Sequence, residues 1–97
     1  MSVDVLIHSF TGSIHDADGH AYRARALGRQ RADRMWVGWL EFRPISSGML
    51  LRRSPIETTQ PNREALAYWA SGLEPVYLEG ALARAMASPS RSRASSR

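Results

Sequence analysis

The stretch from Met35 to Pro44 has one apolar and one mixed face when it is read with the period of a strand. Side chains of a strand point to opposite faces with a period of two, so the even-numbered residues share one face. That face is apolar and consists of Trp36, Gly38, Leu40 and Phe42. The odd-numbered face holds Met35, Val37, Trp39, Glu41 and Arg43. The pattern predicts a central strand whose even face lies in the core, with Trp39 exposed on the other face.

Two other segments show the same alternation. Residues 3–10 alternate well enough to predict a strand. Between residues 22 and 27, Arg23 and Arg25 alternate with alanine and tyrosine, which predicts a half-buried strand with an arginine-bearing outer face. A short strand is also predicted over residues 49–53 because prolines and turn residues flank it. The predicted polar connections span residues 11–20, 28–34, 45–48 and 56–61.

Hydrophobic residues in the C-terminal half follow the period of a helix. They recur at spacings of three and four at Leu66, Trp69, Ala70 and Leu73. This spacing predicts a helix from about Pro61 to Ser71, capped by Thr59. Its apolar stripe should lie on the even face of residues 35–43.

A second helix is predicted from Pro75 to about Met86, because apolar residues again recur at helical spacing. Gly80 weakens this helix by about 1 kcal/mol relative to alanine. The alternative is a short strand over residues 76–78, followed by a helix that begins at Ala81.

Together these elements predict an α+β fold, in which an antiparallel sheet of three or four strands carries one or two C-terminal helices on one face. The chain has 97 residues, a length that supports one hydrophobic core. A single domain is therefore expected over residues 1–87. Residues 88–97 are rich in serine and arginine, have little apolar surface and are predicted to be disordered.

The composition excludes several classes of site. The chain has no cysteine, so disulfides, thiolate metal ligands and cysteine nucleophiles are excluded. The N-terminal segment lacks a basic region, and Asp4 and His8 interrupt its apolar residues. It is expected to be neither a signal peptide nor a membrane span. A cytoplasmic protein without a membrane partner is the resulting expectation.

Positive charge is concentrated in the middle of the chain. Residues 20–53 contain eight arginines but only two acids, Asp33 and Glu41, which gives a net charge of +6. Residues 1–19 have a net charge of −3, and residues 54–87 one of −2. The predicted sheet is therefore the basic part of the molecule.

The predicted outer face of the sheet places Arg23, Arg25 and Arg43 around Trp39, with residues 52–53 as further candidates. An aromatic ring among guanidinium groups suits single-stranded nucleic acid, because bases stack on the ring and phosphates pair with arginine. A solvated face, or one covered by a partner subunit, would account for the same charges.

Protein binding is the preferred function. Exposed Val37 and Trp39 with arginine at the edge are residue types that protein interfaces favour. We therefore expect a small non-enzymatic binding or adaptor protein that acts through protein contacts, including homodimerisation. Its binding residues would be Arg23, Arg25, Val37, Trp39 and Arg43. Nucleic-acid binding is the alternative, and neither a cofactor nor a small-molecule substrate is expected.

The segment from His15 to His20 is the other candidate site. It places Asp16 and Asp18 between two imidazoles, and both groups are suitable ligands for zinc or another divalent ion. A metal-dependent hydrolase is therefore a second alternative, with His8 as a further candidate ligand. A closed metal site needs about four ligands at set angles, however, whereas a polar turn accounts for the aspartates and Gly19 without a metal. The turn is the prediction, and no metal is expected.

Catalytic motifs do not occur in the sequence. It has no nucleophile elbow, phosphate-binding glycine loop or dinucleotide fingerprint. The carboxylates of Glu41 and Glu57 would form an acid/base pair only if the fold brought them together. We therefore expect that the protein is not an enzyme.

Three stretches of the chain, WVGWLEF at 36–42, ETTQPNR at 57–63 and YWASGLEP at 68–75, carry a resemblance. Taken together they resemble a family of small bacterial proteins to which no activity is assigned. The resemblance covers residues 20–86. It implies a free-standing domain and supplies no catalytic residue, substrate or cofactor.

Overall fold

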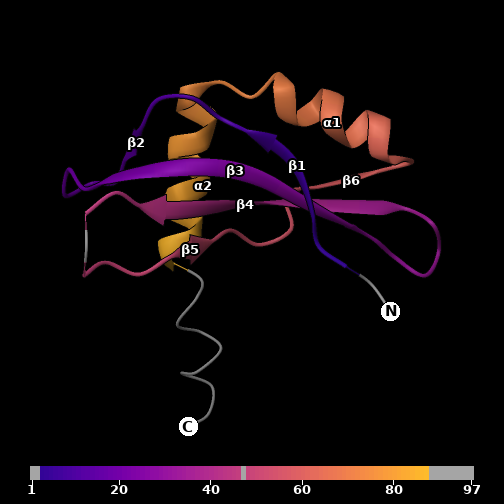
Figure 1. Cartoon of the computed structure of the whole chain (residues 1–97), viewed down its shortest axis with the longest axis horizontal. Helices are drawn as coiled ribbons and strands as arrows, with labels where there is room; N and C mark the ends of the chain where they lie inside the picture. The colour runs from indigo at the N-terminus through magenta and orange to yellow at the C-terminus, as the bar shows by residue number, and fades with distance from the viewer. Residues whose placement is uncertain (1–2, 47, 88–97) are drawn as a thin grey trace, which may run out of the picture.

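The computed structural model describes residues 3–46 and 48–87, so the predicted disordered tail at 88–97 lies outside the described residues. Six strands and then two helices follow one another along this part of the chain (Figure 1). The strands are β1 (Val5–Ser9), β2 (Ile14–His15), β3 (Ala21–Gln30), β4 (Trp36–Pro44), β5 (Arg52–Arg53) and β6 (Thr58–Gln60). The helices are α1 (Arg63–Ser71) and α2 (Pro75–Ala87).

The six strands form one antiparallel sheet around the long hairpin of β3 and β4. Its order is β1-β3-β4-β5, and the short strands β2 and β6 pair with β3 and β4 respectively. The hairpin register runs from Tyr22 opposite Pro44 to Gln30 opposite Trp36. Its turn is closed by Asp33, whose carboxylate accepts a hydrogen bond from the Met35 backbone N–H at 3.1 Å.

The structure confirms the α+β fold and both C-terminal helices. It corrects the sheet, which has additional short strands where connections were predicted. Residues 58–60 are one such strand, because Thr58 and Thr59 hydrogen-bond along β4 instead of preceding a helix. Consequently Thr59 is not the helix cap. Asn62 caps α1, and its side-chain oxygen accepts a hydrogen bond from the Ala65 N–H at 2.8 Å.

Residues 75–87 form a single helix, α2, and the alternative of a strand at residues 76–78 is wrong. Figure 1 shows α2 crossing the sheet and α1 lying near β1 and β6. Both helices pack on the same face of the sheet, here called the inner face. In the described part of the chain, neither helix has the length and apolar character that crossing a membrane requires.

The hydrophobic core lies between the inner face and the helices, as the sequence predicts for the even-numbered residues. Strands β3 and β4 contribute alternate residues, and α2 contributes a stripe with helical spacing. The fully buried members are Tyr22, Ala26, Leu40, Phe42, Ala70, Ala81, Leu82 and Ala85.

Two glycines allow α1 to approach the sheet closely. Gly28 of β3 is directly opposite Gly38 of β4. A Cβ atom added to Gly28 would lie 2.5 Å from a methyl group of Leu66, and one added to Gly38 would lie 2.6 Å from its other methyl group. Leu66 is fully buried. Because both glycines lack a side chain, they leave a depression in the sheet, and Leu66 inserts into it.

We expect Gly38→Ala to lower the free energy of unfolding by about 1–3 kcal/mol, because the new methyl group overpacks the site of Leu66. The same substitution should cost less in a Leu66→Ala background, where the obstructing methyl groups are gone. Urea denaturation of the four proteins of this cycle measures both costs.

Gly80→Ala is the matched control. Its new Cβ would meet only the far end of the Arg84 side chain, at 3.4 Å. Alanine is favoured over glycine inside a helix, so this variant should be more stable by about 1 kcal/mol. Equal costs of Gly38→Ala in both backgrounds would show that Leu66 is not the obstacle.

Candidate nucleic-acid interface

The face of the sheet opposite the helices, here called the outer face, carries the basic residues of the strands. Residues directly opposite one another in neighbouring strands point to the same face, so the register assigns its members. They lie in four rows across the sheet. These rows are Arg23–Arg43, Ser9–Arg25–Glu41–Arg53, Leu6–Leu27–Trp39 and Arg29–Val37–Thr59.

The structure contradicts the predicted exposure of Val37 and Trp39. Trp39 is on the outer face as expected, but its exposed fraction is 0%, and that of Val37 is 4%. The guanidinium carbon of Arg53 lies 4.2 Å from the centre of the indole ring, and that of Arg29 lies 5.1 Å away. Arginine side chains are long enough to fold over a neighbouring aromatic ring. The docking surface built on an exposed tryptophan is therefore wrong.

The middle of the outer face is partly neutralised by acids. Arg25 donates a hydrogen bond from Nε to the Glu41 carboxylate directly opposite it. Arg29 lies 3.9 Å from the carboxylate of Asp4, which is half exposed. These pairs reduce the positive potential near Trp39 without removing it.

Arg23 and Arg43 form the unneutralised end of the face. They are directly opposite one another and both are exposed. Within residues 3–46 and 48–87, neither guanidinium has a hydrogen-bonded or ionic partner. Like charges at directly opposite positions destabilise a sheet. Together with Arg25 they line a hollow of about 300 Å³ that includes Ser9 and Phe10.

Of the predicted binding residues, the structure thus brings together Arg23, Arg25 and Arg43. The two further candidates, Arg52 and Arg53, lie on opposite faces of the sheet. Arg53 is on the outer face, whereas Arg52 is opposite Phe42 and points to the inner face. Arg29 was missed because residues 28–34 were predicted to be a connection. Continuing the alternation of Arg23 and Arg25 past Gly28 would have found it.

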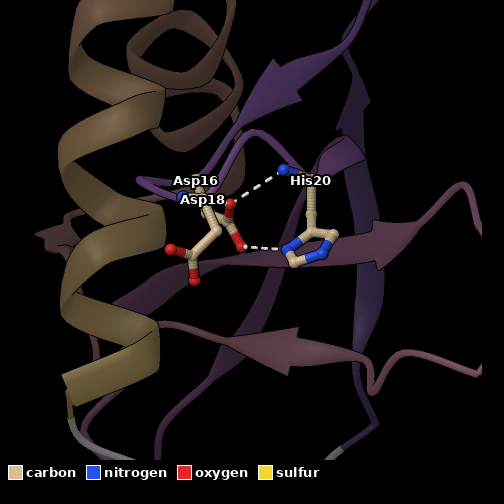
Figure 2. Close-up of side chains that lie close together, drawn as sticks. All are labelled: Asp16, Asp18 and His20. Atoms are coloured by element: carbon tan, nitrogen blue, oxygen red, sulfur yellow. Dashed lines mark hydrogen bonds and ion pairs between the residues drawn. The ribbon is translucent and has the colours of Figure 1, made fainter.

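The segment from His15 to His20, which was weighed as a metal site and predicted to be a polar turn, forms a hairpin turn between β2 and β3. Figure 2 shows the carboxylate of Asp16 facing the ring of His20. Candidate ligand atoms of Asp16, Asp18 and His20 all lie within 4.8 Å of one another. His15 is exposed on β2, and neither it nor His8 belongs to this group.

Hydrogen bonds within the turn account for the position of Asp16. Its Oδ1 accepts from the backbone N–H groups of Asp18 and His20, both at 2.9 Å. Its Oδ2 lies 3.3 Å from His20 Nδ1 and 3.4 Å from the hydroxyl of Tyr22. Desolvation raises the pKa of Asp16, but these hydrogen bonds outweigh it and the pKa is lowered. The structure therefore supports the predicted polar turn.

Glu41 and Glu57 do not form a carboxylate pair. Glu41 binds Arg25 on the outer face, whereas Glu57 binds α2. The Oε1 of Glu57 accepts hydrogen bonds from the Tyr77 hydroxyl at 2.6 Å and from Arg84 Nη2 at 2.8 Å, and its Oε2 accepts from Arg84 Nε at 3.1 Å. This two-point ion pair connects α2 to the segment that precedes β6.

Comparisons with known proteins give no relative to guide the assignment. No family model matches the chain, and neither a curated protein nor a solved structure matches it. The resemblance to a family of small bacterial proteins therefore stays a prediction.

The Tyr77–Glu57 hydrogen bond predicts a loss of stability at high pH. Burial and the Glu57 carboxylate raise the pKa of Tyr77 from 10.0 to about 12. Because the folded-state pKa is the higher one, the contribution of Tyr77 is complete below pH 10.0 and is lost as the pH rises towards about 12. Urea denaturation of the wild type and Tyr77→Phe across this range measures the effect. The advantage of the wild type should decline, and a constant difference would contradict the assignment.

Proposed function

We propose that this protein is a non-enzymatic binding protein that recognises the phosphate backbone of nucleic acid with the outer face of its sheet. The observation that carries the proposal is the pair formed by Arg23 and Arg43. These arginines are directly opposite one another, lack an acidic partner in the described part of the chain, and line a hollow with Arg25.

A phosphate group would relieve the repulsion within this pair. Guanidinium groups donate parallel hydrogen bonds to phosphate oxygens, and such charge-assisted bonds are stronger than neutral ones. An anion between Arg23 and Arg43 would therefore turn an unfavourable contact into a favourable one. Along β3 the arginines continue to Arg29, a distance of about 20 Å for an extended strand. That length suits a chain with repeated phosphates better than a single small anion.

Two further features support binding over catalysis. The Asp16 carboxylate is used within a turn, and the Glu57 carboxylate is fixed by Arg84 and Tyr77. Neither group is left poised to transfer a proton to a ligand on the outer face. A cytoplasmic location would give the protein access to nucleic acid.

Self-association is the second candidate, on a different surface from the one that the sequence indicated. Several apolar residues of the connections between β4 and β6 are exposed, with Leu50 at 68% and Leu51 at 52%. Exposed apolar residues close together in the chain favour contact with a second copy. Light scattering over a range of protein concentrations tests this, and a monomer at every concentration would exclude it.

Arg23→Ala and Arg43→Ala should each weaken binding of a labelled oligothymidylate at low ionic strength. For single strands, the logarithm of the binding constant falls with the logarithm of salt concentration by about 0.7 for each phosphate neutralised. Each variant should therefore reduce this slope by about 0.7, because one phosphate contact is lost. Fluorescence anisotropy titrations at several salt concentrations measure both quantities.

Arg63→Ala is the matched control, since it removes the same charge from α1 on the helical side of the sheet. It should leave the slope unchanged. Binding without any dependence on salt, or an equal effect of all three substitutions, would contradict the assignment of the outer face. Absence of binding at low ionic strength would remove the proposed function altogether.

A further inference from the structure

We infer that Trp39 is a covered base-stacking platform, which phosphates expose by drawing Arg29 and Arg53 away from the indole ring. This inference rests on the proposed function and narrows its ligand to single-stranded nucleic acid. It explains why a tryptophan lies in the centre of a basic face and is nevertheless buried.

The first supporting observation is the indole N–H of Trp39. Its Nε1 atom is buried and has no hydrogen-bond partner in the part of the chain that the structure describes. The indole N–H is a donor only, and leaving a donor buried without an acceptor is unfavourable. A ligand oxygen or a water could accept this hydrogen bond once the ring is exposed, which would offset part of the cost of exposing the ring.

The second observation is that Arg29 and Arg53, which cover the ring of Trp39, are weakly held. Arg53 is exposed, has no carboxylate within ion-pair distance among the described residues, and contacts the ring of Trp39. Arg29 is 36% exposed at its side chain, and its nearest carboxylate, that of Asp4, is 3.9 Å away. Water that reaches the two guanidinium groups weakens their cation–π contacts with the buried ring, whereas hydrogen bonds from guanidinium to phosphate are charge-assisted. A phosphate backbone can therefore compete for both arginines.

The third observation is the apolar row to which Trp39 belongs. Leu27 lies directly opposite Trp39, and Leu6 lies opposite Leu27 and is 48% exposed. A row with arginines flanking it on both sides combines an apolar surface for bases with donors for phosphates. The bases of a duplex are already stacked on one another, so only a single strand can use this row.

The experiment uses Trp36→Phe/Trp69→Phe, a double variant in which Trp39 is the remaining tryptophan. Its emission is followed during titration with oligothymidylate and, separately, with an abasic phosphodiester chain of the same length. We expect oligothymidylate to quench the emission and to bind about tenfold more tightly, because each stacked base adds to the affinity. The abasic chain should bind through phosphates and leave the ring without a base to stack on it.

A second readout uses the wild type, so that the result does not depend on folding of the double variant. The indole N–H resonance of Trp39 in a ¹H–¹⁵N spectrum is assigned by comparison with the single variants Trp36→Phe and Trp69→Phe. It should shift on addition of oligothymidylate and shift less with the abasic chain. If the double variant loses its near-ultraviolet circular dichroism, it is not folded. The ¹H–¹⁵N spectrum of the wild type then tests the inference by itself.

The outcomes separate the inference from the proposed function. If oligothymidylate and the abasic chain bind with equal affinity and quench equally, Trp39 is not a base-stacking platform. The proposal that the outer face binds phosphates would still stand. Tighter binding of a duplex than of a single strand would also overturn the platform. If polyglutamate quenches the emission of Trp39 as strongly as oligothymidylate does, the inference is overturned, and the result would indicate an acidic protein partner. Failure of every oligonucleotide to bind at low ionic strength would overturn both conclusions.

Discussion

The register between β3 and β4 is the constraint on which the rest of the structure depends. The even-numbered residues from Tyr22 to Gly28 and from Trp36 to Phe42 are apolar or glycine, and the observed pairing places even-numbered residues of β3 opposite even-numbered residues of β4. A shift by one residue would turn the arginines of β3 towards the core. The same register places Gly28 opposite Gly38, and the depression that they form receives Leu66 of α1. The position of the helix and the composition of the outer face therefore have a common origin.

The register also decides how charge is distributed on the outer face. It gives Arg25 an acidic partner in Glu41 but places Arg23 opposite another arginine. Trp39 lies between these charges and is covered by Arg29 and Arg53. At one end of this face lies a pair of arginines without an acidic partner among the described residues, and at its centre lies a covered aromatic ring. This arrangement differs from that of an ordinary solvated sheet. That difference supports a ligand with both phosphates and bases.

Long elements with a strong period could be predicted, whereas of the short strands only β5 was predicted, within a strand expected over residues 49–53. The apolar even-numbered face of residues 36–42 and the helical spacing of Leu66, Trp69 and Ala70 identified β4, α1 and the packed face. Strands β2, β5 and β6 contain two or three residues each, too few for a period. They form because the edges of β3 and β4 offer unpaired backbone groups. For the same reason the helix cap was misplaced, since β6 takes Thr59 into the sheet and leaves Asn62 to cap α1.

By itself the sequence determined the α+β class, the two faces of the sheet and the excess of arginine on one of them, because periodicity and charge are local properties of the chain. Only the tertiary structure decided which arginines have an acid opposite them and whether Trp39 is exposed. Both depend on side chains that are distant in sequence and come together through strand pairing, as Arg53 does with Trp39. Strand pairing decides which ring an arginine side chain can reach on a neighbouring strand, and the residue pattern along a single strand does not reveal it.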